Sequence, residues 1–378
     1  MKILLVVSKK ITALQYFRQD MPHDALKITN PDFTFGKVTS DVPGFPDVMQ
    51  IPEEELAKYD IVSYLRQISY DRQINIDTVN YLRNKRKKII FDIDDWWRVP
   101  RTHAFFPHYE KHNIPEIIEH TLGLVDAVTT TNGYLADKIE PFNENVWVLP
   151  NAINPEEKQF TKRNIESSLI RFGWVGGVHH LADMEIMRQA MRKANLLPNV
   201  QICLGGFNLS GPEYFEMEKI LTDGHRSVMG DREYIEYLAA GTPAMEHVGF
   251  FKPYRRLWAR DINNYADIYN DLDVVLAPLV DNNFNRCKSE LKLIEAGWMG
   301  KCVIASDIYP YNEVIEHGVD GFLVSPQRGI DWYLFMKRLS ENPDLIKSMS
   351  EKFEKKIREL FDIHDINKIR LDLYKNIL

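Results

Sequence analysis

Short, nearly unbroken runs of apolar and β-branched residues recur along the chain, separated by segments with a helical period. Runs of this kind are typical of parallel strands whose two sheet faces are both covered by helices. They are too many for one ordinary open sheet, so the pattern predicts an α/β protein with two doubly wound, Rossmann-like domains facing a cleft. The expected strands are 2–8, 60–65, 88–93, 126–130, 146–149, 169–175, 200–205, 247–251, 272–277, 301–306 and 321–324.

The domain boundary is expected in the polar stretch 154–168. It divides the chain into a first domain at 1–155 and a second at 165–360. Two helical patterns end the chain, and a break at 362–365 would let the last helix, 361–378, turn back onto the first domain. One apolar face is expected to hold Ile346, Met349, Phe353, Ile357 and Leu360, and the other Ile366, Ile369, Leu373 and Ile377.

The net charge of −7 argues against a protein that binds polyanions over its whole surface. One dense basic run, 83–88, has two interpretations: the solvated last turn of a helix, or a contact with anionic lipid or nucleic acid. The three cysteines show no metal or disulfide spacing, which fits a reducing compartment. With no signal peptide or membrane span in the sequence, we expect a cytoplasmic protein, and peripheral membrane contact stays open.

The most informative stretch is 285–297, after the expected strand 272–277. Written as one helix, it points Leu291, Ile294 and Trp298 into the core and groups Lys288, Lys292 and Glu295 on another face. A helix start that carries Lys288 and Ser289 suits a phosphate, because free backbone N–H groups and the positive helix end add to the side chains. The structural alternative is a Lys–Glu pair on a solvated surface.

This stretch resembles the C-terminal signature of the large retaining GT-B glycosyltransferase family, glycosyl transferases group 1, as do 301–307 and 318–324. In that family two glutamates lie on the helix; the second binds the nucleotide ribose, and Glu295 occupies its place. The first, which contacts the donor sugar, falls at Cys287, so this sequence departs from the family there. The residues match instead a subgroup with a Lys-Ser-x-x-Lys-x-x-Glu pattern: Lys288, Ser289, Lys292 and Glu295.

A glycine pair, Gly176-Gly177, follows the expected strand 169–175 and precedes a helix. Glycine lets the backbone approach a ligand closely, and the helix start behind it favours an anion. The pair resembles the diphosphate-binding loop of the same family, with His180 and Asp183 as further members of the loop. A helix-capping role for Asp183 is the alternative.

An acidic cluster, Asp92, Asp94 and Asp95, ends the expected strand 88–93 and is followed by Trp96 and Trp97. It could supply a base, bind a cation or hold sugar hydroxyls, with the tryptophans stacked on sugar rings; a helix cap with a buried polar network is the alternative. An Asp-x-Asp metal site is disfavoured, because GT-B enzymes typically hold the diphosphate without metal. Three further segments also resemble the first-domain signature of the subgroup: 16–18, 129–131 and 149–153.

The resemblance implies a glycosyltransferase that moves a sugar from a UDP- or GDP-sugar to an acceptor hydroxyl. Retention of the anomeric configuration is part of what the family implies, and no metal is strictly required. Lys288, Lys292, Arg286 and the glycine pair would stabilise the departing diphosphate, and Asp94 or Asp95 would orient the acceptor or act as base.

Several alternatives stay open. The acceptor is expected to be a cell-surface polysaccharide or a lipid-linked sugar, or else a modified base in phage-type DNA. Other classes are a GT-B-fold epimerase and a sugar-nucleotide-binding protein without turnover, which Cys287 would favour. The oligomeric state and the role of the irregular stretch 208–244 are left open by the sequence.

Overall fold

The computed structural model describes residues 1–7, 12–39, 47–177, 180–207 and 255–378. The expected strand 247–251 and the stretch 208–244 lie outside these residues. The described chain forms two compact units. Unit 1 comprises Met1–Pro155, Arg286–Ser289 and Phe361–Leu378, and unit 2 comprises Glu156–Asn285 and Glu290–Leu360.

Unit 1 is built on a parallel sheet with the strand order β2-β1-β3-β4-β5-β6. Its strands are β1 (Lys2–Val6), β2 (Thr34–Val38), β3 (Ile61–Leu65), β4 (Lys88–Ile93), β5 (Ala127–Thr130) and β6 (Val146–Val148). The central strands are buried, as their apolar sequences require. The sequence pattern missed β2, because this edge strand is only partly buried and reads Thr-Phe-Gly-Lys-Val.

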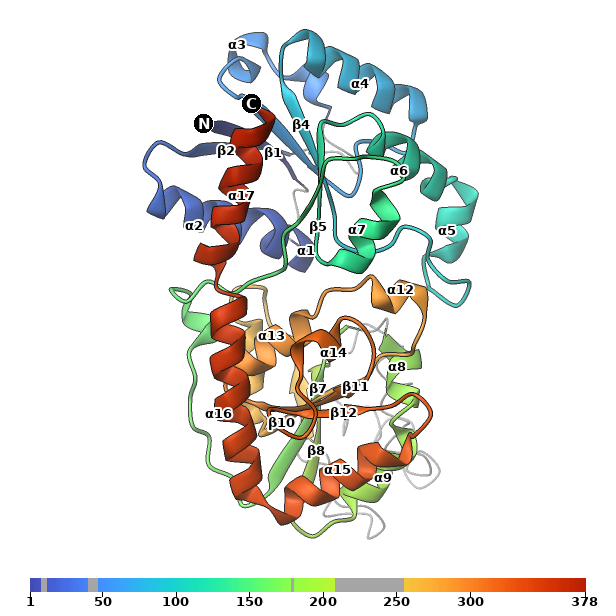
Figure 1. Cartoon of the computed structure of the whole chain (residues 1–378), viewed down its shortest axis with the longest axis vertical. Coiled ribbons are helices and arrows are strands. Elements are labelled where there is room, and N and C mark those ends of the chain that lie inside the picture. The colour runs from blue at the N-terminus through green and yellow to red at the C-terminus, as the bar shows by residue number, and fades with distance from the viewer. Residues whose placement is uncertain (8–11, 40–46, 178–179, 208–254) are drawn as a thin grey trace, which may run out of the picture. The chain divides into compact units, whose positions relative to one another are not determined.

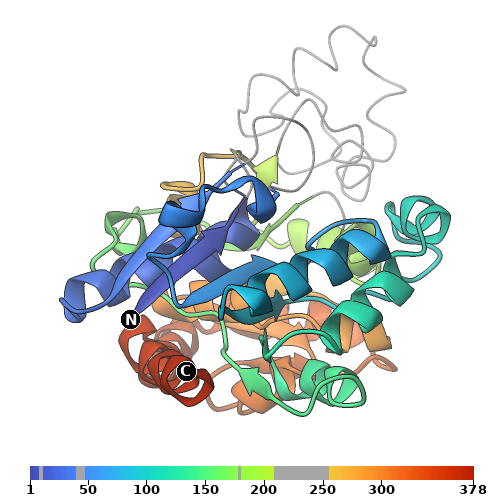
Figure 2. The same ribbon diagram turned by 90° about the horizontal axis from the view of Figure 1, so that it is seen from above.

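Helices connect these strands, and Figure 2 shows α4 running along the sheet. An aspartate, Asp71, caps α4 by accepting the backbone N–H groups of Gln73 and Ile74. The helices of unit 1 are α1 (Ala13–Gln15), α2 (Met21–Thr29), α3 (Glu53–Leu56), α4 (Arg72–Asn84), α5 (Phe106–Lys111), α6 (Ile114–Leu122), α7 (Gly133–Ile139) and α17 (Ile363–Ile377), with a π-helical turn η1 (Tyr16–Asp20) and a 3₁₀ turn η2 (Val48–Gln50).

Unit 2 is built on a second parallel sheet with the order β12-β11-β10-β7-β8-β9. Its strands are β7 (Ile170–Val175), β8 (Val200–Phe207), β9 (Arg255–Trp258), β10 (Val274–Ala277), β11 (Cys302–Ser306) and β12 (Phe322–Val324). Counted within the unit, this is the order 3-2-1-4-5-6 of a dinucleotide-binding sheet, with its switch point between β7 and β10. The edge strand β9, Arg-Arg-Leu-Trp, is the second strand that the apolar pattern missed.

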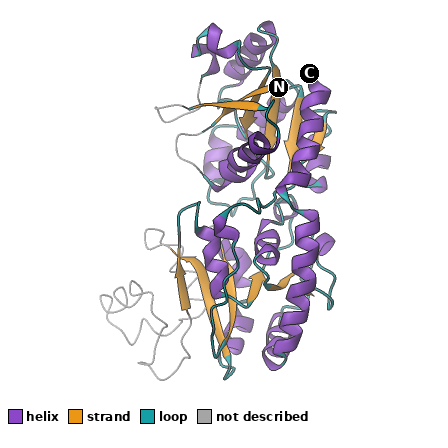
Figure 3. Ribbon diagram, turned by 90° about the vertical axis from the view of Figure 1, so that its left-hand side faces the viewer, coloured by secondary structure: helices purple, strands orange, loops and turns teal. Residues whose placement is uncertain are grey.

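The helices of unit 2 are α8 (Leu181–Glu185), α9 (Arg188–Asn195), α13 (Leu291–Trp298), α14 (Tyr311–Val314), α15 (Ile330–Glu341) and α16 (Pro343–Leu360), with the 3₁₀ turns η3 (Lys158–Phe160) and η6 (Tyr265–Asp271). The short helix α12 (Asn283–Arg286) spans the point where the chain passes from unit 2 to unit 1. Helices lie on both sides of the strands in each unit, as Figure 3 shows. The two-sheet α/β architecture that the sequence predicts is therefore confirmed.

The last two helices belong to different units (Figure 1). The helix α16 packs on α13 and β11, and the helix α17 packs on α2. Between them Asp362 caps α17, and Ile153 exchanges backbone hydrogen bonds with Phe361 and Ile363. Two residues of the predicted apolar helix faces are not buried: Leu360 is 50% exposed and Ile369 is 40% exposed.

Candidate functional site

The carboxyl end of β7 lies at the switch point of unit 2, where sheets of this order bind ligands. A Cβ atom at Gly176 would lie 2.7 Å from Nζ of Lys292 and 2.7 Å from Cζ2 of Trp174, so only glycine fits there. At Gly177 a Cβ atom would meet nothing within 4 Å. The ammonium of Lys292 lies 5.5 Å from the centre of the buried Trp174 ring. The structure thus brings the predicted lysine to the predicted glycine pair.

The pair His180 and Asp183 follows this loop. His180 Nδ1 lies 2.8 Å from Oδ2 of Asp183. The other carboxylate oxygen accepts hydrogen bonds from Val280 N, at 2.8 Å, and from Asn285 Nδ2, at 3.0 Å. Through these bonds the aspartate joins the loops after β7 and β10 and orients the His180 ring. This role differs from the capping alternative, in which the side chain would serve only the start of α8.

The glutamate Glu295 is buried on α13, 6% exposed. Its two oxygens each accept a hydrogen bond of 2.5 Å from a tyrosine hydroxyl, one from Tyr265 and one from Tyr269 on η6. Burial raises the pKa of Glu295, although the tyrosines and Lys292 oppose the rise. The alternative of a Lys–Glu pair on a solvated surface is therefore wrong.

The stretch 285–297 is not one helix. Helix α13 begins only at Leu291, after Glu290 at its N-cap, so Lys288 and Ser289 do not share a helical face with Lys292 and Glu295. The expected core residues Ile294 and Trp298 of α13 are buried, whereas the expected core residue Leu291 is only partly buried.

The preceding segment, Arg286–Ser289, packs in unit 1. There Cys287 is buried in the core of the unit, and burial raises the pKa of its thiol to about 12. The side chain of Asn132 donates to Lys288 O at 2.8 Å, and that of Asn151 donates to Ser289 Oγ at 3.0 Å. Cys287 therefore packs in the apolar core of unit 1.

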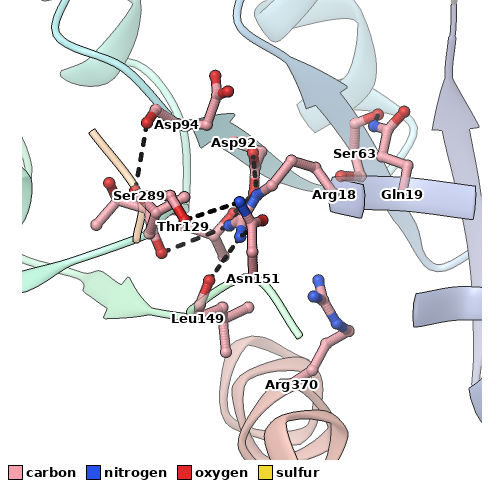
Figure 4. Close-up of polar contacts among 12 residues, drawn as sticks. Arg18, Gln19, Ser63, Asp92, Asp94, Thr129, Leu149, Asn151, Ser289 and Arg370 are labelled. Carbon is pink, nitrogen blue, oxygen red and sulfur yellow. Dashed lines mark hydrogen bonds and ion pairs between the residues drawn. The ribbon is translucent and has the colours of Figure 1, made fainter. Parts of the chain in front are cut away.

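The three acidic residues in and just after β4 have different partners. Figure 4 shows Asp92 beside Arg18. Asp92 is buried and pairs with Arg18, whose Nη2 lies 2.8 Å from its Oδ2. Asp94 and Asp95 both contact the guanidinium of Arg66, the latter at 2.6 Å. Burial raises the pKa of Asp94, although Arg66 opposes the rise. Thus Asp92 forms the buried network of the structural interpretation, while Asp94 and Asp95 stay available as functional candidates.

The expected stacking of Trp97 on a sugar ring is wrong. Its side chain is 3% exposed, its indole N–H donates to Glu119 at 3.0 Å, and its ring meets Phe142 edge-on at 6.2 Å. The Trp97 ring therefore presents no free face of the kind that stacking needs. Trp96 packs partly buried against the same core.

Tyr265 and Tyr269 were not among the predicted site residues. Their signal was a tyrosine pair four residues apart before β10, but only the fold brings both hydroxyls to Glu295. Arg18 and Asn151 lay in segments noted only for their resemblance, and their connection to Ser289 is also a product of the fold.

The comparisons with known proteins agree with this architecture. Residues 217–342 match the family described as Glycosyl transferases group 1. No curated protein sequence matches the chain. The family match and the fold identify a glycosyltransferase.

Solved structures similar to this glycosyltransferase share its GT-B fold at low sequence identity. Sucrose-phosphate synthase from Thermosynechococcus elongatus is 17% identical, with a TM-score of 0.67 over 100% of this chain and 98% of its own. HepE from Anabaena, in complex with UDP and glucose, is 13% identical, with a TM-score of 0.65 over 99% of each chain. A glycosyltransferase from Rickettsia africae is 16% identical, with a TM-score of 0.64 over 100% of this chain and 98% of its own.

Within the described residues of the glycosyltransferase, no three histidine, cysteine or acidic side chains converge as a metal site would require. In the same residues, no helix combines the length and the apolar character needed to cross a membrane. The basic run makes contacts inside unit 1: Arg83 donates to Leu124 O, Lys85 pairs with Glu53, and Lys87 donates to Tyr59 O. These contacts favour its interpretation as the end of α4.

Proposed function

We propose that this glycosyltransferase transfers a sugar from a uridine-diphosphate sugar to an acceptor hydroxyl, with retention of the anomeric configuration. The observation that carries the proposal is the meeting of Lys292 with the Gly176-Gly177 loop at the switch point of unit 2. The charge of the departing diphosphate would develop where the ammonium of Lys292 is already in place, so little reorganisation would accompany the reaction. The open space beside Gly177 lets the backbone approach a phosphate closely.

Glu295 would hold the ribose. A carboxylate offers about four acceptor positions, so the two tyrosine hydroxyls leave capacity for the hydroxyls of a ribose. The tyrosines also fix the orientation of the carboxylate before the nucleotide arrives. The uridine base is proposed because HepE of this fold was solved with UDP and with UDP-glucose; GDP stays the second choice.

Further donor contacts are proposed for His180, Arg286, Lys288 and Ser289. Asp183 orients the ring of His180, so Nε2 is the atom proposed to face the donor. The pattern of 288–295 motivates the other three. No metal is proposed, because the cationic side chains would supply the positive charge that the diphosphate needs.

For the acceptor, we propose a glycan or lipid-linked sugar whose hydroxyl is oriented by Asp94 or Asp95. Two solved structures of this fold are complexes with sugar ligands, alpha-GlcNAc-glycerol in TarM and GlcNAc in GtfA, which supports a carbohydrate acceptor. A role in polysaccharide assembly at the cytoplasmic side of a membrane would follow.

The test is nucleotide binding to the full chain. Thermal unfolding is measured with UDP-, GDP-, ADP- and CMP-sugars, in EDTA and then with Mg²⁺, because a ligand of the folded state raises the unfolding temperature. We expect a UDP-sugar to raise it in EDTA. Glu295→Ala should weaken UDP binding about tenfold or more, since a hydrogen bond to a charged group is lost, while Glu351→Ala, at an exposed position of α16, should not.

Two results would contradict the proposal. Stabilisation by none of the nucleotides in either condition would indicate a binding protein of another kind, and equal UDP affinity of Glu295→Ala and the unaltered chain would remove the ribose role. NMR of the product's anomeric proton decides between retention and inversion.

A further inference from the structure

A chain of hydrogen bonds, buried except at its partly buried last link, leads from Asp92 to Ser289 in unit 1 (Figure 4). Arg18, which is 1% exposed, donates to both oxygens of Asp92, to Leu149 O at 2.6 Å and to Asn151 Oδ1 at 3.2 Å. The amide of Asn151 then donates to Ser289 Oγ at 3.0 Å. The chain thus ends on a hydroxyl of the predicted donor-binding pattern.

The direction of every bond in this chain is fixed. A guanidinium only donates hydrogen bonds, so the atom of Asn151 that faces Arg18 must be the carbonyl oxygen. The NH₂ group of the same amide must then face Ser289. Thr129, which donates to Asp92 Oδ2 at 2.6 Å, holds the start of the chain. Ser289 therefore accepts from Asn151, and its own proton points elsewhere.

The backbone around Ser289 is held as well. Asn132 uses its carbonyl oxygen to cap α7 through Leu135 N and its NH₂ group to bind Lys288 O. Cys287 anchors the segment in the apolar core. Ser289 is itself half-buried, and within the described residues no acceptor takes its hydroxyl proton.

From this geometry we infer that the Ser289 hydroxyl is a preset hydrogen-bond donor to a phosphate oxygen of the nucleotide, and that Arg18 and Asn151 are positioning residues that set its direction. The inference rests on the proposed function. A buried, fully directed network of this kind contributes little net stability by comparison with apolar packing, but it removes the cost of orienting the hydroxyl when an anion binds. Donor affinity would then depend on residues far away in sequence.

The test uses Asn151→Asp, which keeps the shape of the side chain and its contact with Arg18. The carboxylate can only accept, so it draws the Ser289 proton toward itself and away from the phosphate. UDP affinity is measured by calorimetry on the full chain for Asn151→Asp, Ser289→Ala and the double variant. We expect each single variant to bind UDP about tenfold more weakly or worse. The double variant should lose far less than the product of the two factors.

Ser289→Thr, which keeps the hydroxyl, is expected to retain most of the UDP affinity. This variant therefore separates the loss of the hydroxyl as a hydrogen-bond donor from the loss of packing. If Asn151→Asp weakens binding by the same factor in the unaltered chain and in the Ser289→Ala variant, the new charge acts without the serine and the inference is overturned. Unchanged affinity of both single variants, with Glu295→Ala still weakened, would overturn it while leaving the proposed function intact. A chain that binds no nucleotide would overturn both.

Discussion

At the scale of single residues, the end of β4 shows how position decides what a carboxylate does. Asp92 still lies in the strand and points to Arg18, so both charges are buried and paired. Asp94 and Asp95 follow the strand and contact Arg66, a residue with φ of 61° in the left-handed region that non-glycine residues seldom adopt. Strained backbone of this kind is commonly found at functional sites. The division separates one structural acid from two candidates for chemistry.

Asp94→Asn tests that division. We expect the transfer rate to fall about 100-fold or more, because a positioned acid or base contributes on that scale, while UDP affinity stays unchanged. The rate is measured with a saturating donor and the affinity by calorimetry. Asp95→Asn is the comparison, since its side chain is more exposed, 31% against 16%. Full activity of Asp94→Asn would return this aspartate to a structural role.

At the scale of elements, α2 and α17 are joined through a buried histidine. His23 Nδ1 lies 2.5 Å from Gln19 O, which can only accept, so Nδ1 carries the proton. Nε2 then accepts from the hydroxyl of Tyr374 at 2.8 Å, and Phe33 stacks on the same tyrosine. Burial, with smaller contributions from nearby cations, lowers the pKa of His23 to about 3. The contact between the two helices therefore needs a neutral imidazole.

This lowered pKa predicts acid sensitivity of unit 1. Below pH 6.5 His23 becomes protonated in the unfolded chain, whereas in the folded chain it stays neutral down to about pH 3. Stability is therefore lost as the pH falls through this window, by roughly 4–5 kcal/mol at its lower end. His23→Gln should make the free energy of unfolding less dependent on pH between about 6.5 and 4, as measured by urea unfolding at several pH values. An equally steep dependence in the variant would show that other groups cause it.

At the scale of the whole molecule, the described chain forms two compact units, and its last two helices are divided between them. Phe353 and Ile357 of α16 are buried in unit 2, and a Cβ atom at Gly297 of α13 would lie 2.4 Å from Ile357. Leu373 and Tyr374 of α17 are buried in unit 1. Each unit thus has its own stabilising contacts at the C-terminal end of the chain.

Two matched substitutions of buried side chains by alanine test whether the two units unfold separately. Leu373→Ala should destabilise unit 1 by about 2–5 kcal/mol and Phe353→Ala should destabilise unit 2 by about 3–5 kcal/mol, because each leaves a cavity in a closed core. Hydrogen exchange reports the result by segment. We expect faster exchange in β1 and β3 for the first variant and in β10 and β11 for the second. Faster exchange throughout the chain in either variant would show that the two units unfold together.

The sequence alone determined the architecture. Of the expected strands, 88–93 has the bounds of β4, and the others among the described residues lie within a few residues of β1, β3, β5–β8 and β10–β12. Buried parallel strands must be apolar on both faces, so their positions can be predicted from runs of apolar residues. The pattern missed β2 and β9 because their sequences mix polar and apolar residues.

The tertiary structure decided the site. The sequence pattern selected Gly176, Lys292 and Glu295 as site residues. It also predicted Lys288 and Ser289 on the same helix as Lys292, whereas α13 begins only after Glu290 and the two residues pack in unit 1. It also had no means of assigning Tyr269 to Glu295 or Asn151 to Ser289, partners that lie 26 and 138 positions away. Local periodicity records which residues must be buried, but hydrogen-bond partners between distant segments depend on which strands become neighbours, and that is settled only when the sheets form.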